Sequence, residues 1–410
     1  MKRLLIGILW VYTATLLQGQ SLENLWQMAA QQNPSLRAEF NQYLAALERV
    51  DQKKALPDPT VGFGYFISPV ETRVGAQRFK LSLSQMFPWM GTLKTKESLA
   101  AKQAQIQFTE FTDARNRLFM EVSESWLALS ELTQIIEVQK QNLRLLEGYL
   151  PIAKTKYESN LTTLADLLRI EIRIEQASTD LELLEMKKKP ILSDLNTFLN
   201  RNEDLNIDAF YVKNTIDSDS SSLDSALINN PRVKANLLKV ESSDLLIELS
   251  EQQRKPNIGL GLDYVFVSKR TDMIVNDNGK DIFMPMLSVS LPVFGRKNKA
   301  QKREAELIKE GIKIRTSAIE NDIKNQWTQA EYLENSSDTQ LALYDKEIRN
   351  TQSLLNVLTS EYSNNSSNFE ELLITQQRLL QLQIAQIKAK TNGKRAIIKK
   401  KYLIGNFFIN

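Results

Sequence analysis

Hydrophobic residues recur every third or fourth position over two very long stretches, residues 92–157 and from residue 296 onward. In the first stretch the recurring apolar residues are Phe111, Ala114, Leu118, Val122, Trp126, Leu129, Leu132 and Ile136, at close to the coiled-coil period. A helix over residues 92–157 would be roughly 100 Å long at about 1.5 Å per residue. A compact domain needs no helix of that length, whereas a spacer across an aqueous gap does.

Two other regions alternate apolar with small or polar residues, which predicts a β-hairpin over residues 59–87 and another over 256–291. In the first hairpin we expect one strand over residues 60–67, a turn that contains Ser68, Pro69 and Gly75, and a second strand that ends at Phe87. In the second we expect a longer polar loop over residues 268–281. Strands of this length and pattern suit an outer membrane, although a surface hairpin has the same pattern.

The two halves of the chain repeat the same landmarks. Four pairs lie 197 residues apart: Asn33 and Asn230, Pro59 and Pro256, Gly62 and Gly259, and Gly64 and Gly261. A constant offset indicates an internal duplication. The first repeat covers residues 21–222, with the hairpin 59–87 and a long helical hairpin over 92–189. The second covers 223–410, with the hairpin 256–291, a long helical hairpin over 296–391 and a C-terminal segment.

Each long helix is predicted to reverse at a shared motif. In the first repeat Tyr157 precedes Asn160, which can adopt the left-handed conformation that ends a helix, and Thr162 or Thr163 can cap the returning helix ahead of Asp166. The motif recurs 205 residues later, with Tyr362, Asn365 and Glu371 at the matching positions and Ser366 or Ser367 as the cap.

Composition removes several classes of chemistry. The chain of 410 residues contains no Cys and no His, so disulfides, thiolate zinc sites, catalytic triads and imidazole acid–base chemistry are excluded. With 52 basic and 49 acidic residues it has no strongly basic face for nucleic acid. We predict no enzyme, no catalytic residue, no cofactor and no metal site. A carboxylate-based hydrolase has little support, because no glycine-rich phosphate loop is present.

The N-terminus is typical of a targeting signal. Lys2 and Arg3 precede an apolar run from Leu4 to Leu17 that is too short to span a bilayer. Residues 1–20 are therefore predicted to be a secretory signal peptide, cleaved after Gly19 or Gln20. No later stretch has 18 consecutive apolar residues, so any insertion into a membrane would use the strands.

Four strands of membrane length cannot close a barrel, for which about eight are needed. An open sheet in lipid would leave two rows of unpaired backbone groups, each costing several kcal/mol. If these strands lie in a membrane, the chain must form an oligomer, and a cyclic homo-oligomer lets the two edges pair head to tail.

The ordered series of Asn-Pro, helix, Pro-x-x-Gly-x-Gly, hairpin, Pro-x-x-Gly, long helix and Tyr-x-x-Asn, present twice, resembles the TolC-type outer membrane efflux proteins over nearly the whole chain. The resemblance implies a mainly helical α+β fold and a homotrimer. Its twelve-stranded β-barrel in the outer membrane would continue into a periplasmic α-helical barrel, with an equatorial segment near residues 200–222. It also implies a passive duct, supplied by a proton-driven or ATP-driven inner-membrane pump through a periplasmic adaptor.

The resemblance further implies which residues meet the adaptor. These helix-tip residues are Tyr157, Asn160, Leu161, Thr162, Thr163, Leu164, Tyr362, Asn365, Ser366, Ser367, Asn368 and Phe369. Glu371 would line the constriction, where a ring of three carboxylates favours cations. The alternative is that Asp166 and Glu371 only occupy first turns of helices, where the helix dipole favours acidic side chains.

A periplasmic coiled-coil scaffold or adaptor without a pore is the competing interpretation. It accounts for the signal peptide and the long helices, but it leaves the four paired strands unexplained. Drug, metal-ion and polypeptide export share the predicted architecture, so the pattern does not separate these substrates.

Overall fold

The computed structural model describes residues 22–202, 222–293, 295–364 and 369–407. The predicted signal peptide, residues 203–221 of the predicted equatorial segment, and Asn365, Ser366, Ser367 and Asn368 lie outside the described residues. The chain forms two compact units. We call Glu39–Phe111 with Arg232–Ile319 the sheet unit, and the described residues of Met1–Ala38, Thr112–Pro231 and Glu320–Asn410 the helical unit.

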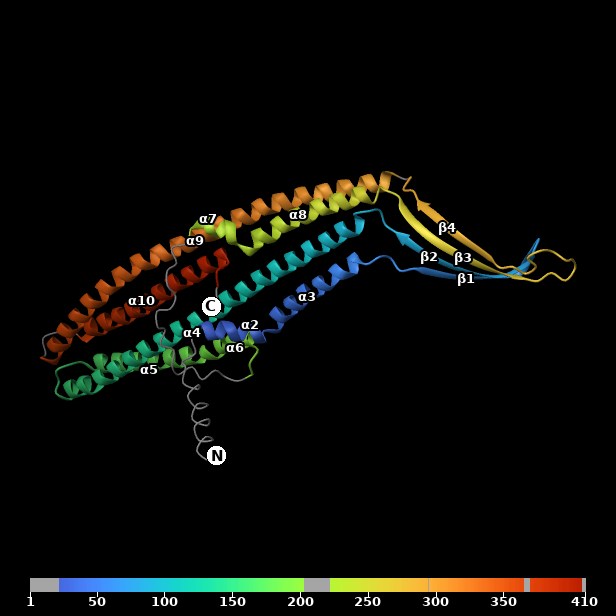
Figure 1. The fold of residues 1–410 in the computed structure, drawn as a ribbon. Helices are drawn as coiled ribbons and strands as arrows, with labels where there is room; N and C mark the ends of the chain where they lie inside the picture. The colour runs from blue at the N-terminus through green and yellow to red at the C-terminus, as the bar shows by residue number, and fades with distance from the viewer. Residues whose placement is uncertain (1–21, 203–221, 294, 365–368, 408–410) are drawn as a thin grey trace, which may run out of the picture. The chain divides into compact units, whose positions relative to one another are not determined.

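The elements occur in the same order in both halves of the chain (Figure 1). The first half contains α2 (Leu22–Gln32), α3 (Pro34–Lys54), β1 (Thr60–Thr72), β2 (Gly75–Phe87), α4 (Thr92–Glu158), α5 (Leu164–Met186) and α6 (Lys188–Leu199). The second contains α7 (Leu223–Asn229), α8 (Pro231–Gln252), β3 (Asn257–Ser268), β4 (Ile282–Ser290), α9 (Gly295–Ser363) and α10 (Phe369–Ile404). The chain is therefore mainly helical, with one small antiparallel sheet, as predicted.

The two hairpins join into one four-stranded sheet in the order β1-β2-β3-β4. Every neighbouring pair is antiparallel, and the central pairing of β2 with β3 places Leu83 opposite Leu262 and Leu81 opposite Tyr264. In the described part of the chain, β1 and β4 each pair on one side only. The sheet therefore has two open edges.

The helices of the sheet unit follow the same order as the strands. The ring of Phe40 in α3 lies 5.3 Å from that of Phe111 in α4, measured between centroids. Lys102 in α4 forms an ion pair of 2.7 Å with Glu241 in α8. Lys302 and Lys309 of α9 form ion pairs with Glu251 and Asp244 of α8. In this row of four helices, α3 and α9 are the outer members, just as β1 and β4 are the outer strands.

The turn of the first hairpin is shorter than predicted, and its predicted start at Ser68 and Pro69 is wrong. β1 does not stop at residue 67 but runs through Ser68 and Pro69 to Thr72, with a register shift between Tyr65 and Val70. Proline has no backbone N–H to donate, and it is tolerated here because β1 is an edge strand with a register shift. The turn itself covers residues 73–74, directly before Gly75, which the predicted turn also contained. The φ of Gly75 is +131°, and a Cβ there would come within 1.8 Å of the Ser268 carbonyl oxygen.

The helical unit is built around residues far apart in sequence. The ring of Trp26 in α2 stacks on Phe119 in α4, with centroids 5.8 Å apart, and Phe407 after α10 contacts both rings at 5.3 and 6.1 Å. The indole of Trp26 also donates to the Phe119 carbonyl at 3.1 Å and to the Ser123 hydroxyl at 2.9 Å. Leu22, Leu25, Trp26 and Ala29 form the buried face of α2.

The repeated Asn-Pro landmarks perform the same task in both repeats. The side-chain amide of Asn33 donates to the carbonyl of Phe198 at 3.0 Å, and that of Asn230 donates to the carbonyl of Leu403 at 2.8 Å. Each asparagine thus fastens the start of α3 or α8 to the end of the returning helix of its own repeat.

The returning helices differ between the repeats. The first breaks at Lys187 between α5 and α6, close to the predicted end at residue 189, whereas α10 continues past the predicted end at residue 391 to Ile404. Pro190 explains the difference, because a proline inside a helix removes a hydrogen bond and clashes with the preceding turn. The matching position in the second repeat is Arg395, which does not interrupt a helix. None of the helices that the structure describes has an apolar stretch long enough to cross a membrane.

Candidate functional site

The first reversal, between α4 and α5, has the geometry that its sequence predicts. Asn160 is left-handed, with φ 56°, and the amide of Leu161 donates to the Lys156 carbonyl at 2.8 Å while that of Asn160 donates to Tyr157 at 3.0 Å. This pair of bonds is the Schellman arrangement that ends a helix. Tyr157, Asn160, Leu161, Thr163 and Leu164 are exposed, and Thr162 is half-buried.

A capping box begins the returning helix. The Thr163 hydroxyl accepts from the Asp166 amide at 3.3 Å, and the Asp166 carboxylate accepts from the Thr163 amide at 3.4 Å. That carboxylate also accepts from the hydroxyls of Thr162 and Thr163, at 2.8 and 2.9 Å, and from Arg169 at 2.9 Å. Partial burial raises the pKa of Asp166, but these hydrogen bonds together outweigh it, so the pKa lies below the ordinary value. Asp166 is therefore a helix-capping residue.

Tyr362 and Phe369, on either side of the second reversal, are buried rather than exposed. Their rings stack with centroids 4.7 Å apart, inside an apolar cluster drawn from α4, α5, α9 and α10. Burial also raises the pKa of the Tyr362 hydroxyl. The two aromatic residues thus lie beneath the surface of the tips.

Two basic residues that sequence reasoning missed link the reversals. Lys156 donates to the Tyr362 carbonyl and places its ammonium nitrogen 4.4 Å from the centroid of the Tyr362 ring. Arg169 in α5 lies 3.5 Å from the carboxylate of Glu370 in α10. A lysine in the last turn of a helix looks like ordinary compensation of the helix dipole, so the sequence carries no signal for the first contact.

Glu371, the predicted constriction residue, is exposed in the first turn of α10. Its neighbour Glu370 faces Arg169, whereas the structure shows no ion pair for Glu371 among the described residues. Both the constriction role and the plain first-turn position are compatible with this placement, so the role of Glu371 stays a prediction.

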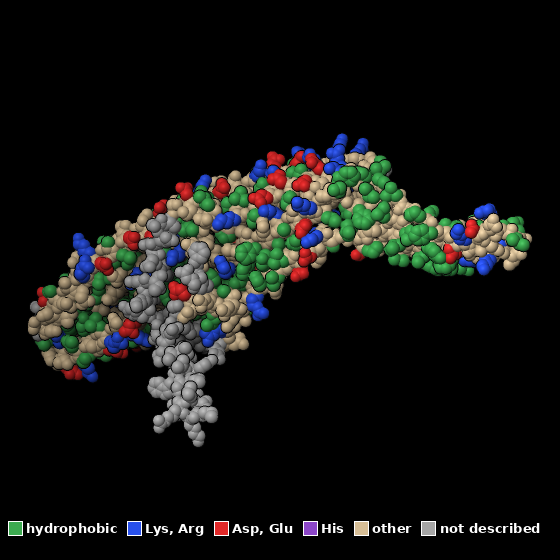
Figure 2. Space-filling model, viewed as in Figure 1, with side chains coloured by type: hydrophobic (Ala, Val, Ile, Leu, Met, Phe, Trp, Pro, Cys, Tyr) green, Lys and Arg blue, Asp and Glu red, His purple; other side chains and the backbone are tan. Residues whose placement is uncertain are grey.

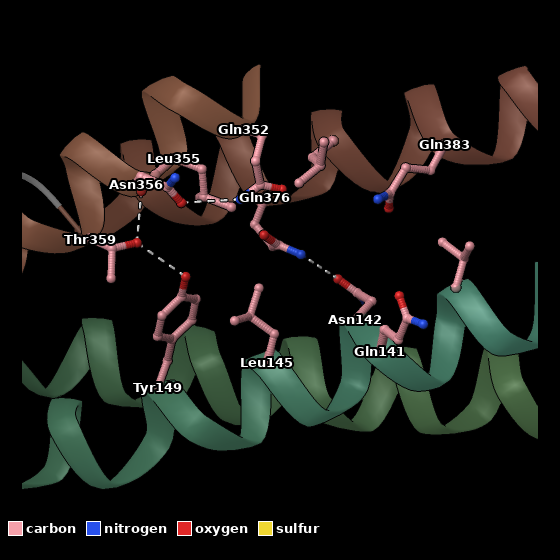
Figure 3. A pocket seen from close by; sticks show the side chains of 12 residues that line it. Gln141, Asn142, Leu145, Tyr149, Gln352, Leu355, Asn356, Thr359, Gln376 and Gln383 are labelled. Carbon is pink, nitrogen blue, oxygen red and sulfur yellow. Dashed lines mark hydrogen bonds between the residues drawn. The ribbon is translucent and has the colours of Figure 1, made fainter. Parts of the chain in front are cut away.

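A polar cavity of about 450 Å³ lies deeper in the helical unit, between α4, α9 and α10 (Figure 3). Its walls carry amide side chains, and the Gln376 amide donates to the Asn142 side-chain oxygen at 3.1 Å. The hydroxyls of Tyr149 and Thr359 are 3.4 Å apart across it. No charged residue lines the cavity. Amide and hydroxyl side chains thus share the walls of this cavity with apolar ones.

The two faces of the sheet differ in chemistry. One face carries large apolar side chains, and Figure 2 shows hydrophobic side chains gathered over the sheet. The exposed apolar residues of that face are Val61, Phe63, Tyr65, Leu81, Leu83, Leu260, Phe283, Leu287 and Val289. On the other face Gly62, Ser82 and Asp263 lie in register across three strands.

That second face holds an ion pair at the junction of the hairpins. Lys80 in β2 pairs with Asp263 in β3, where the aspartate side chain is 0% exposed and the lysine side chain 36% exposed. The pair joins the first repeat to the second, next to the backbone of Gly62 and Gly64. One face of the sheet is therefore suited to lipid and the other to water.

Residues 25–201, the first repeat without its ends, match the family model described as "Outer membrane efflux protein". This family comprises efflux channels of the outer membrane and not enzymes, which places the protein in the outer membrane as the channel component of an efflux system. A comparison of the sequence with curated proteins finds no match.

Solved structures of several membrane proteins share the fold of this protein. CusC matches with a TM-score of 0.81 at 14% identity, covering 95% of this chain and 93% of CusC. VceC from Vibrio cholerae matches with 0.75 at 14%, covering 94% and 96%. A membrane protein from Pseudomonas aeruginosa matches with 0.79 at 17%, covering 94% and 90%. These likenesses extend across both repeats, beyond the part that the family model covers.

Proposed function

We propose that the protein is a passive duct, made of three copies whose sheets close into one twelve-stranded barrel in the outer membrane. The observation that carries the proposal is the pair of open edges, β1 and β4, on a sheet with one apolar face. An edge left open in lipid costs several kcal/mol for each unpaired backbone group. Joining β1 of one copy to β4 of the next removes both edges at once, and a cyclic assembly closes the ring.

In such a barrel, one face of the sheet contacts lipid and the other contacts water. The apolar face with Val61, Phe63 and Leu287 contacts lipid, and the face with Gly62, Ser82, Lys80 and Asp263 lines the water-filled interior. Alternation of this kind is what a membrane strand needs, since successive side chains point to opposite sides. The long helices continue from the strands and form the periplasmic part of the duct.

The helix tips meet a periplasmic adaptor, which connects the duct to a proton-driven or ATP-driven pump in the inner membrane. The exposed residues of the first reversal, Tyr157, Asn160, Leu161, Thr163 and Leu164, provide the contact surface. Tyr362 and Phe369 support that surface from the interior, because their rings pack within the apolar core of the helix tips. Glu371 faces the lumen at the constriction.

Recording current across a planar lipid bilayer that contains the purified protein tests the duct directly. Discrete current steps are expected from protein that is trimeric in detergent. A trimer that inserts and gives no steps would contradict the proposal. Protein that stays in aqueous solution without detergent would support the scaffold alternative instead.

A further inference from the structure

Three methionine side chains share the face of the sheet that carries Ser82 and Asp263, here called the lumen face. Successive side chains of a strand point to opposite faces. Met284 and Met286, two residues apart in β4, are on the lumen face because Met284 lies opposite Asp263. Met86 in β2 is on it as well, because it lies four residues from Ser82, which is also opposite Asp263. Met86, Met284 and Met286 are 38%, 42% and 39% exposed, so their thioether groups are accessible from this face.

Two glycines of β3 leave open the space into which two of these side chains extend. Met86 lies opposite Gly259, and Met286 lies opposite Gly261. A Cβ at Gly259 would lie 3.5 Å from the Met86 sulfur, and a Cβ at Gly261 would lie 3.3 Å from the Met286 terminal methyl group. Positions two residues apart in a strand are separated by about 7 Å. The ends of the two methionine side chains therefore lie over neighbouring positions of β3, which they reach from β2 on one side and β4 on the other.

The surroundings of Met86 and Met286 differ from those of an apolar core. Methionine often fills irregular gaps in cores, because its side chain is flexible. Apart from the methionines, the two rows of residues that cross the strands here carry small side chains. These are Thr60, Ser84 and Gly261 in the row of Met286, and Gly259 and Ser288 in the row of Met86. Rows of small residues give a methionine little apolar surface to pack against, so packing does not account for the two side chains.

The chemistry of the thioether group indicates which ligand would bind here. Thioether sulfur is a soft, neutral ligand that selects Cu(I) and the chemically similar Ag(I), whereas the hard cations Mg²⁺ and Ca²⁺ take oxygen ligands. The lack of Cys and His excludes thiolate and imidazole sites, but thioethers belong to neither class. Asp263 is paired with Lys80, so this pair adds no net charge beside Met284. A soft cation with a single charge therefore fits the set of side chains best.

We infer that the lumen face binds soft monovalent cations, of the Cu(I) and Ag(I) class, through the sulfur atoms of Met86 and Met286. The inference rests on the proposed function and deepens it, because it names such ions as substrates of the duct. The three rotatable side-chain bonds of methionine let both sulfur atoms approach one ion above Gly259 and Gly261. Met284 supplies a further sulfur atom two residues along β4.

A site of neutral ligands suits an ion in transit better than a resident metal ion. Conduction requires binding that is favourable enough for an ion to enter and weak enough for it to leave. Thioethers carry no charge, so they bind a cation less tightly than the thiolates of a structural metal site do. In the proposed trimer the three copies of the site lie at one level of the barrel, along the path that an exported ion takes.

Methyl NMR of the full-length protein in detergent, isotope-labelled at the methionine methyl groups, tests the site with silver nitrate as the probe. Silver is chosen because Ag(I), unlike Cu(I), is stable in air. The methyl signals of Met86 and Met286 are expected to shift and to saturate at low silver concentration, and magnesium nitrate is expected to shift neither. Met90, which follows β2, and Met273, between β3 and β4, are exposed internal controls that should respond only at higher silver concentration. Equal responses from all four residues, or no response at Met86 and Met286, would overturn the inference.

A pair of matched double variants tests the role of the sulfur atoms. Met86→Leu with Met286→Leu removes both sulfur atoms with little change in volume, so the fold is expected to persist. The silver concentration that shifts the Met284 signal is expected to rise roughly 10-fold or more, since even the loss of a group that only orients a metal ligand costs that much. Met90→Leu with Met273→Leu is the control, and it is expected to leave the response of Met284 unchanged. Equal silver dependence in the two double variants would overturn the inference.

Bilayer recordings separate this inference from the proposed function. In potassium nitrate, Met86→Leu with Met286→Leu is expected to give the same current steps as wild type, because the variant alters the silver site and not the pore. Wild-type protein that gives current steps but shows no silver-dependent shift at Met86 would remove the site and leave the duct intact. Wild-type trimers that insert and give no current steps would remove the duct, and with it the export of the ion.

Discussion

The ammonium group of Lys156 lies over the ring of Tyr362, with the nitrogen 4.4 Å from the ring centroid, and donates to the Tyr362 backbone carbonyl. The lysine belongs to the last turn of α4 and the tyrosine to the last turn of α9, so this contact joins the ends of the two long helices. A charged donor on a free carbonyl at a helix end satisfies a group that the helix itself cannot.

Replacing Lys156 by Met keeps most of the packing and removes both polar interactions. A hydrogen bond to a charged group contributes about 2 kcal/mol. We expect backbone amides near Tyr362 to exchange with deuterium faster by a factor of roughly 10 to 100. Lys154→Met, an exposed lysine of the same helix, is the control. Equal exchange in both variants would show that Lys156 does not hold the end of α9.

Asp166→Ala removes the capping box of α5. Loss of such a cap costs about 1 kcal/mol, so the first turn of α5 should exchange faster at neutral pH. Glu171→Ala, an exposed acidic residue further along α5, is expected to have no such effect.

The capping box also predicts a pH dependence. Because the pKa of Asp166 is lowered in the folded protein, its contribution is fully present above the unfolded value of about 3.9 and is lost as pH falls through the folded value. Wild type and Asp166→Ala should therefore differ at pH 7 and converge in strong acid. A difference that persists unchanged through that range would contradict a capping role for the carboxylate.

Glu371→Gln tests the constriction. If three Glu371 side chains ring the lumen, the variant should be less selective for cations, and the reversal potential in a salt gradient should move toward zero. Glu370→Gln is a close control, because Glu370 is adjacent in sequence but faces Arg169. Equal selectivity in Glu371→Gln and wild type would leave Glu371 as a first-turn residue only.

The ion pair between Lys80 and Asp263 predicts that replacing either partner lowers thermal stability by a different amount. Lys80→Met leaves a fully covered carboxylate without its partner, whereas Asp263→Asn leaves a lysine that reaches solvent. We expect the first variant to lower the thermal stability of the sheet more than the second, measured by heat-induced mobility change on gels. The reverse order would show that the carboxylate already has access to water.

Periodicity alone predicted the long helices and the four strands, because each pattern repeats over many residues. The residues typical of turns were a less reliable guide to where the hairpin turns. Ser68 and Pro69 resemble a turn, but they lie within an edge strand where a missing N–H costs little. Gly75 was predicted to lie in the turn, but the sequence does not show that the carbonyl of Ser268, from the other repeat, leaves no room there for a Cβ.

Contacts between distant segments could not be predicted from the sequence. Trp26, Phe119 and Phe407 meet only after three elements fold together, and nothing in their spacing indicates this. The same holds for Lys156 and Tyr362. By contrast, the left-handed Asn160 and the cap at Thr163 follow from local residues and were predicted.

The mass of the full-length protein in detergent, measured by native mass spectrometry, tests the central claim that the open edges β1 and β4 are closed by other copies of the chain. The account predicts complexes of three chains. Protein that remains a single chain while its sheet is folded would contradict it.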